Sequence, residues 1–198
     1  MKTKCLWICI VVMALMPFQV YAGAPMETVE TEVKKILAVL GDQTLTDEVG
    51  TTAKKEKLRA IFDDTFDYVV LSKRTLGRNW KKFDTEQQNE FIKLYRKLLD
   101  SVYMDRLLAY KDEKVVFSKE RMISEKRAEV FSNIVTSDKK IPIDYRLILK
   151  KNQWKVYDVI IEGVSLVKNY RSQFNDILSK NEPEELLKIL REKTRVKE

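Results

Sequence analysis

The clearest feature of the hydrophobic pattern is a change of period inside one stretch, residues 154–174. Its first half carries β-branched and aromatic residues without a proline, which is typical of a buried strand. Gly163 interrupts this run, and Ser165 stands where a helix N-cap is expected. Beyond it, apolar residues recur at helical spacing: Val167, Tyr170, Phe174, Ile177 and Leu178. We therefore predict a strand that turns at residues 162–163 directly into an amphipathic helix.

Helical spacing of apolar residues dominates the chain before residue 111. The expected helices cover residues 27–40, 54–71 and 85–110, with a polar connection at 42–52 and a short helix or turn at 76–80. Gly41 is placed to end the first helix. Thr85 with Gln88 fits a capping box at the start of the third, which is the most apolar of the helices.

After residue 111 the period becomes that of strands. Four runs are expected to be strands: residues 115–122, 128–136, 141–149 and 154–161. The short, turn-like joints between them favour an antiparallel meander. One face of the third strand collects Ile143, Tyr145, Leu147 and Leu149. On the fourth, we expect Tyr157, Val159 and Ile161 to face the helices.

The order of elements sets the fold class. Helices come first, the strands follow as a block, and the chain ends with a helix over residues 165–179 and another that carries Pro183 in its first turn. This order predicts an α+β fold in which amphipathic helices cover one face of a four-stranded antiparallel sheet. A twisted sheet with helices across it can enclose an apolar cavity.

The N-terminal residues look like a secretory signal peptide. Lys2 and Lys4 precede a short apolar run at 6–18, and Val20-Tyr21-Ala22 fits a cleavage site. We expect cleavage after Ala22, so that residues 1–22 are the signal peptide and 23–198 form a single domain with its core at about 27–192. We therefore expect the protein to be exported.

The composition narrows the possible chemistry. The chain has no histidine, and its two cysteines, Cys5 and Cys9, lie in the leader. We therefore expect no metal site, no disulfide and no cofactor in the mature domain. Asp158 interrupts an apolar run; it could be a catalytic carboxylate, but a structural hydrogen-bond acceptor is the favoured interpretation. No Gly-x-Ser-x-Gly motif is present, which argues against a hydrolase.

Several motifs occur in an order that resembles a known family. They include the run from Trp154 to Leu166 followed by Tyr170-Arg171-x-Gln173-Phe174, and, upstream, Phe66-Asp67-Tyr68, Leu76-Gly77-x-x-Trp80 and Gln87-x-x-x-Phe91 through Leu99, Tyr103, Leu107 and Tyr110. Together with the signal peptide, they resemble the MlaC family of periplasmic phospholipid-binding proteins, also called toluene-tolerance auxiliary proteins. The resemblance covers residues 27–192, and nothing is transferred from the family beyond Lys180.

This resemblance implies both a fold and a function. Its members have an NTF2-like sheet with helices around it and hold a phospholipid by its acyl tails. They carry lipid between an outer-membrane lipoprotein complex and an inner-membrane ABC transporter, which maintains the lipid asymmetry of the outer membrane. On this basis we expect a monomeric lipid shuttle that is not an enzyme, with phospholipid as its cargo and no nucleic-acid partner.

The candidate lipid pocket follows from the apolar faces together with the resemblance. Its predicted residues are Leu99, Tyr103, Leu107, Ile143, Tyr145, Leu147, Tyr157, Val159, Ile161, Val164 and Val167. Tyr103 and Val164 are the preferred members. Periodicity alone favours the simpler interpretation that these residues fill a solid core, and only the resemblance favours a cavity.

A basic segment before the third helix is the candidate docking surface for the membrane complexes. It contains Arg74, Arg78, Lys81 and Lys82, with Trp80 among them, although the sequence alone slightly favours an ordinary solvated turn. Two other classes of function stay open. One is an NTF2-like enzyme acting on an apolar substrate, and the other is a protein–protein adaptor of the cell envelope.

Overall fold

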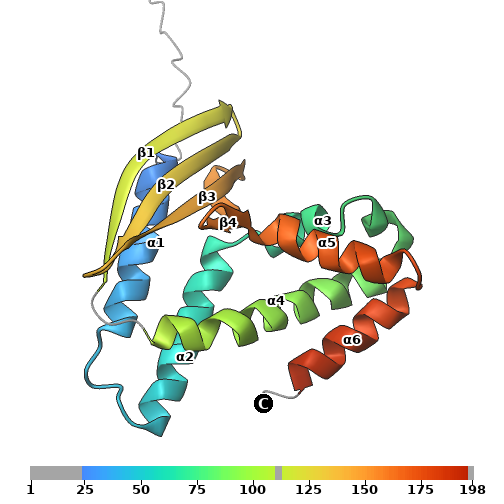
Figure 1. The fold of residues 1–198 in the computed structure, drawn as a ribbon, viewed down its shortest axis with the longest axis horizontal. Helices are drawn as coiled ribbons and strands as arrows, with labels where there is room; N and C mark the ends of the chain where they lie inside the picture. The colour runs from blue at the N-terminus through green and yellow to red at the C-terminus, as the bar shows by residue number, and fades with distance from the viewer. Residues whose placement is uncertain (1–23, 110–112, 196–198) are drawn as a thin grey trace, which may run out of the picture.

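The structure is a computed structural model that describes residues 24–109 and 113–195 (Figure 1). The predicted signal peptide and its cleavage site lie outside these residues. Their helices are α1 (Pro25–Leu40), α2 (Glu48–Thr65), α3 (Tyr68–Leu76), the 3-10 helix η1 (Gly77–Lys82), α4 (Thr85–Leu108), α5 (Leu166–Leu178) and α6 (Pro183–Arg195). None of them is long and apolar enough to cross a membrane.

The strands form one antiparallel sheet in sequence order, as predicted. They are β1 (Lys114–Ser124), β2 (Arg127–Val135), β3 (Lys140–Lys150), β4 (Gln153–Ile161) and β5 (Val164–Ser165). The two-residue β5 was not expected. It forms because Glu162 and Gly163, with φ of 50° and 81°, make a tight turn that brings residues 164–165 back beside β4 before α5 begins. The α+β fold class is confirmed.

The bounds predicted for the second helix, residues 54–71, are wrong. This segment forms the end of α2 and the start of α3. Helix α2 begins at Glu48 because the Asp47 carboxylate accepts a hydrogen bond from the Gly50 amide at 2.6 Å. It stops at Phe66, whose backbone turns extended and forms a bridge with Val156 of β4. Asp67 then starts α3 by accepting from the Val70 amide. The contact of Phe66 with the sheet therefore divides the single predicted helix into α2 and α3.

The start of α4 is also shifted by one residue from the prediction. Asp84 is the N-cap, and the capping box joins Asp84 to Gln87 rather than Thr85 to Gln88. The Asp84 carboxylate accepts from the Gln87 amide at 2.8 Å, and the Gln87 side chain accepts from the Asp84 amide at 3.2 Å. Asp and Thr are both good N-caps, so the sequence pattern alone does not separate the two registers.

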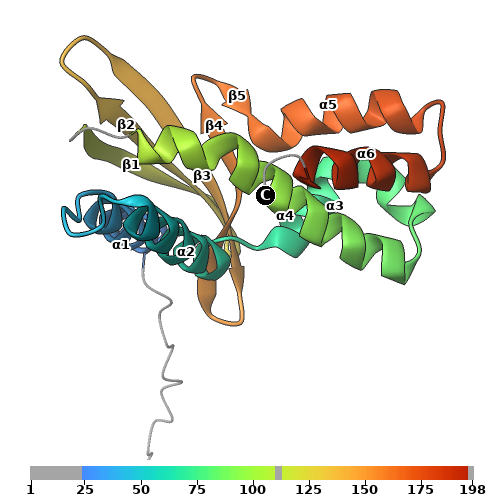
Figure 2. The same ribbon diagram turned by 90° about the horizontal axis from the view of Figure 1, so that it is seen from below.

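Two hydrophobic clusters hold the fold. The helical cluster joins α3, α4, α5 and α6 and contains an aromatic group with ring centroids 5.3–5.7 Å apart: Phe91, Tyr95, Tyr170 and Phe174. The sheet cluster packs Val29 and Val33 of α1 against β2, β3 and β4. Figures 1 and 2 show α1 lying across one face of the sheet, while α4 runs from the helical cluster back toward the sheet. Phe66 packs against both clusters.

Candidate functional site

An apolar cleft of about 220 Å³ lies where the two clusters meet. Its walls come from α1, α2, α3, α4, β3, β4 and the start of α5. Most of the lining side chains are aliphatic or aromatic, and the polar ones are Glu32, Thr65, Tyr68, Asp100, Tyr103 and Tyr145. Such a surface can bind an apolar chain, and it offers few groups for chemistry on a substrate.

The tyrosines of the cleft stay neutral at ordinary pH. Burial raises the pKa of Tyr145 to about 12. Burial also raises the pKa of Tyr68 and Tyr103 above the ordinary tyrosine value. A phenol with a raised pKa does not act as a base near pH 7. These side chains therefore contribute aromatic surface and a hydroxyl group, but no charge.

Seven of the eleven predicted pocket residues line this cleft. They are Leu99, Tyr103, Leu107, Ile143, Tyr145, Val159 and Ile161. The structure thus brings one face of α4 together with one face of β3 and β4, as predicted.

The other four predicted pocket residues lie elsewhere. Leu147 is fully buried in the sheet cluster beneath α1, and Val167 is buried in the helical cluster. Val164, a preferred candidate, is 56% exposed on β5. Val164 does not line the cleft, because it lies on the two-residue edge strand β5, just after the turn at residues 162–163.

Tyr157 does not line the cleft, for a different reason. The pairing of β3 with β4 shifts between Arg146, opposite Asp158, and Leu147, opposite Val156. This irregularity leaves Tyr157 without a partner and breaks the alternation of side chains. Val156 and Val159 both line the cleft, whereas the Tyr157 ring lies under the Arg74 guanidinium at 4.1 Å.

The first two helices also contribute to the cleft, which was not predicted. Val29, Val33 and Ile36 of α1 line it together with Phe62 and Phe66. The signal was present in the sequence, because four of them lie within the predicted helices 27–40 and 54–71, and Phe66 belongs to the Phe66-Asp67-Tyr68 motif. A stripe identifies a buried face, but it does not say whether that face meets protein atoms or a cavity.

Asp158 accepts hydrogen bonds within the fold and does not line the cleft. It is 2% exposed and accepts hydrogen bonds from the Ser165 hydroxyl at 2.6 Å, the Val167 amide at 3.0 Å and Arg146 at 3.1 Å. It pairs in register with Arg146, which lies between the inward-facing Tyr145 and Leu147 and therefore points to the other face of the sheet. An enzyme that uses Asp158 on a substrate in the cleft is not compatible with this geometry.

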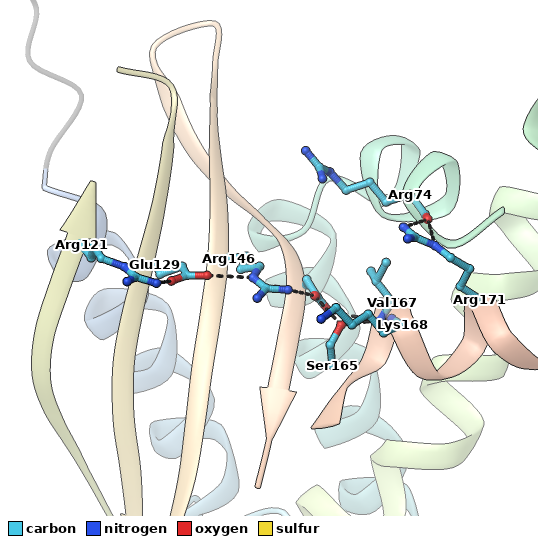
Figure 3. A network of polar contacts seen from close by, with 9 residues as sticks. Arg74, Arg121, Glu129, Arg146, Ser165, Val167, Lys168 and Arg171 are labelled. Carbon is cyan, nitrogen blue, oxygen red and sulfur yellow. Dashed lines mark hydrogen bonds and ion pairs between the residues drawn. The ribbon is translucent and has the colours of Figure 1, made fainter. Parts of the chain in front are cut away.

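The same network continues across the outer face of the sheet (Figure 3). Glu129 of β2 accepts from Arg146 at 2.9 Å and from Arg121 of β1. Burial raises the pKa of Glu129, but the hydrogen bonds from the two arginines outweigh it, and the net shift is downward. Opposite charges in adjacent register stabilise strand pairing, so this ladder fixes how β1, β2, β3 and the β4–α5 corner fit together.

The four predicted docking residues do not have equal access to solvent. Arg78, Lys81 and Lys82 are exposed on η1, whereas Arg74 is half-buried. Arg74 stacks on Tyr157, and its carbonyl accepts from Arg171. Lys82 donates to the Leu178 carbonyl at the end of α5, at 3.2 Å. A docking role is therefore structurally simplest for Arg78 and Lys81, because changing the other two would also disturb internal contacts.

Within residues 24–109 and 113–195, no group of three or more Asp, Glu, His or Cys side chains could hold a metal ion. The cleft is also smaller than the ~300–1,000 Å³ typical of small-molecule pockets. Binding a large apolar ligand therefore requires its walls to move apart.

Comparison with known proteins extends this picture. The family model described as MlaC protein matches residues 30–192, so the match continues through most of α6. The chain is 27% identical over 126 residues to the intermembrane phospholipid transport system binding protein MlaC of Haemophilus influenzae. That match covers 60% of this chain and 59% of the relative, which is less than two thirds of its length.

Two further relatives cover more of the fold. The toluene tolerance protein ttg2D of Pseudomonas putida is 25% identical over 175 residues, covering 87% of this chain and 81% of its own. The phospholipid-binding protein from Ralstonia solanacearum, solved in complex with a phospholipid, matches with a TM-score of 0.76 and 26% identity. That match covers 86% of this chain and 97% of the solved one.

Proposed function

The chain belongs to the MlaC family, and from this premise we propose that it is a periplasmic phospholipid-binding protein that carries lipid between membranes. The observation that carries the proposal is the apolar cleft between the helical and sheet clusters. A relative of the same fold was solved with a phospholipid, and this cleft is the place in the present chain where acyl tails would find apolar walls.

The energetics of such a cleft suit a carrier. Burying about 30 methylenes away from water is worth on the order of 25 kcal/mol at ~0.8 kcal/mol each. The same transfer from a bilayer is close to neutral, because the tails already lie in hydrocarbon. Aliphatic and aromatic walls therefore protect the tails in transit without trapping the lipid.

The finer parts of the proposal concern location and partners. The predicted signal peptide, cleaved after Ala22, would deliver the protein to the periplasm. There it would exchange lipid with an outer-membrane lipoprotein complex and an inner-membrane ABC transporter, and so maintain outer-membrane lipid asymmetry. The exposed Arg78 and Lys81 of η1 are the proposed basic docking surface.

The test is organic extraction of the purified protein followed by mass spectrometry. Wild-type protein should bring glycerophospholipid with it. Ile161→Glu would place a carboxylate in the cleft, where it must stay hydrated or become protonated, so the folded variant should purify with little lipid. The matched control is Val164→Glu, at the residue paired with Ile161 across the β4–β5 turn and 56% exposed.

The control should keep the lipid content of the wild type, with both variants checked for folding by circular dichroism. Absence of phospholipid from the wild type would contradict the proposed function. A folded Ile161→Glu protein that retains the wild-type amount of lipid would show that the cleft is not the lipid-binding site.

A further inference from the structure

Two walls of the apolar cleft, α2 and α4, lie beside each other without a continuous apolar seam. Figures 1 and 2 show α2 next to the second half of α4. A groove of about 850 Å³ lies between them. Helix α2 falls wholly within the described residues, and over its length Leu58 is the one large buried side chain. Neither hydrophobic cluster includes a residue of this helix.

Three ion pairs join α2 to α4. The pairs, with their N···O distances, are Lys55–Asp105 at 3.6 Å, Arg59–Asp100 at 3.4 Å and Asp63–Arg96 at 2.7 Å. The α2 members recur every four residues and therefore lie on one face of that helix. Their partners follow in reverse order along α4, so the pairs form a ladder between helices that run in opposite directions. We call these six residues the α2–α4 latch.

The latch is open to solvent. The exposed fraction of its side chains ranges from 14% for Asp100 to 75% for Asp105. Ion pairs of this kind are individually weak and are screened by salt. The latch can therefore break and re-form more readily than a packed apolar seam.

The two ends of α2 are held by different neighbours. At the C-terminal end, the extended backbone of Phe66 bridges to Val156 of β4, and the Asp67 amide donates to the Val156 carbonyl at 2.9 Å. Near the N-terminal end, Lys54 donates to the Leu40 carbonyl at the end of α1, at 3.1 Å. The sheet thus fixes the C-terminal end. A movement of α2 about Phe66 would separate it from α4 most widely at the N-terminal end.

We propose that the α2–α4 latch holds the cleft closed over its cargo, and that lipid enters and leaves when the N-terminal half of α2 parts from α4. The proposal rests on the proposed function and concerns the regulation of the same site. The cleft of about 220 Å³ is smaller than typical small-molecule pockets, so at least one of its walls must move. Helix α2 is a wall that solvent-exposed ion pairs hold to its neighbour.

The first experiment fixes the latch with a crosslink. The chain has two cysteines, Cys5 and Cys9, both in the predicted signal peptide, so introduced cysteines can be modified selectively in the mature domain. Lys55→Cys with Asp105→Cys is loaded with fluorescent phosphatidylethanolamine and then joined by a reducible bis-maleimide. Release of the lipid into phosphatidylcholine vesicles that contain a quencher measures the rate.

The crosslinked latch should release lipid at least tenfold more slowly than the wild type, and reduction of the link should restore release. The control is Glu30→Cys with Lys34→Cys, an exposed i,i+4 pair that takes the same link within α1. Because this link joins no two helices, the control should release lipid at the wild-type rate.

The second experiment tests the ion pairs themselves. Lys55→Glu places two carboxylates opposite each other and should speed release several-fold, the size expected when an attractive surface pair becomes a repulsive one. Lys55→Glu with Asp105→Lys re-forms the pair with its charges exchanged, and this double variant should return the rate to that of the wild type.

Release at the wild-type rate from the crosslinked latch would overturn the proposal, and so would equal slowing by the crosslink within α1. A double variant as fast as Lys55→Glu alone would also overturn it, since charge pairing would then have no part in closing the cleft. Absence of lipid from the purified wild type would instead refute the proposed function itself.

Discussion

At the scale of single residues, Asp158 shows how a buried charge can serve the fold rather than a reaction. Its carboxylate joins three parts of the chain: Arg146 on β3, Ser165 on β5 and the first turn of α5. The corner at which strand becomes helix therefore depends on one acceptor. Removing it would leave the buried Val167 amide without its acceptor, and Arg146 would keep Glu129 but lose its second carboxylate.

We predict that Asp158→Ala destabilises the protein by about 2–4 kcal/mol, the range for loss of one partner from a buried charged network. Urea denaturation followed by circular dichroism measures this. The control is Asp144→Ala on β3. Burial raises the pKa of Asp144, so the fold does not favour its charged form. Loss of this charge should therefore change the free energy of unfolding little. A change below ~1 kcal/mol for Asp158→Ala would contradict the structural role assigned to it.

At the scale of elements, α6 is an integral part of the helical cluster. Leu186, Leu187 and Leu190 are fully buried against α4 and its neighbours. Arg191 adds a two-point ion pair to Glu90 of α4 at 2.6 and 2.8 Å. Nothing was transferred from the family beyond Lys180, but the family match continues to residue 192 and so includes most of this packed helix.

The Arg191–Glu90 pair makes a pH-dependent contribution. The hydrogen bond from Arg191 lowers the pKa of Glu90 below its ordinary value of 4.5. A depressed folded-state pKa stabilises the folded protein above the unfolded value, and that stabilisation is lost as the pH falls through the folded value.

Arg191→Gln should therefore cost about 0.5–1 kcal/mol at pH 7, a figure kept small because both side chains are partly exposed. The difference from the wild type should shrink below pH 4.5 and vanish at lower pH. Thermal unfolding at a series of pH values measures it, with Lys188→Gln as the control for an exposed helical lysine. A difference that persists at pH 2–3 would contradict the assignment to Glu90.

The elements also show what sequence alone could predict. Periodicity located the strands and most helices, because burial of one face is a local pattern. It joined α2 to α3 because the break at Phe66 depends on a contact with Val156, a residue far along the chain. Of the eleven pocket residues named from the sequence, seven line the cleft and four do not. Tyr157 and Val164 are among the four, because a bulge and an edge strand depend on the assembled sheet.

At the scale of the whole molecule, the two faces that serve the proposed function are separate. The cleft lies between the two clusters, whereas η1 lies at the far end of α3, where Arg78 and Lys81 are exposed. Under the proposed function, substitutions on η1 would therefore change docking without changing the cleft.

We predict that Arg78→Glu with Lys81→Glu slows lipid delivery between the two membrane complexes by roughly tenfold at low salt, and by less at physiological salt, where charges are screened beyond ~8 Å. Fluorescent lipid transfer between reconstituted complexes measures the rate, and extraction measures the bound lipid, which should not change. The control is Lys34→Glu with Lys188→Glu. Delivery at the wild-type rate in low salt would indicate that η1 is an ordinary solvated segment with no role in docking.

The position of the cleft between two clusters has a consequence for how long the protein would survive in the cell under the proposed function. Because Phe66 touches both clusters and lines the cleft, a bound tail would complete an interior that the empty chain leaves unfinished. A ligand that binds only the folded state lowers the population of opened molecules, which are the ones that proteases cleave. Under the proposed function, empty carriers would be degraded first, and the supply of lipid would help to set how many carriers survive.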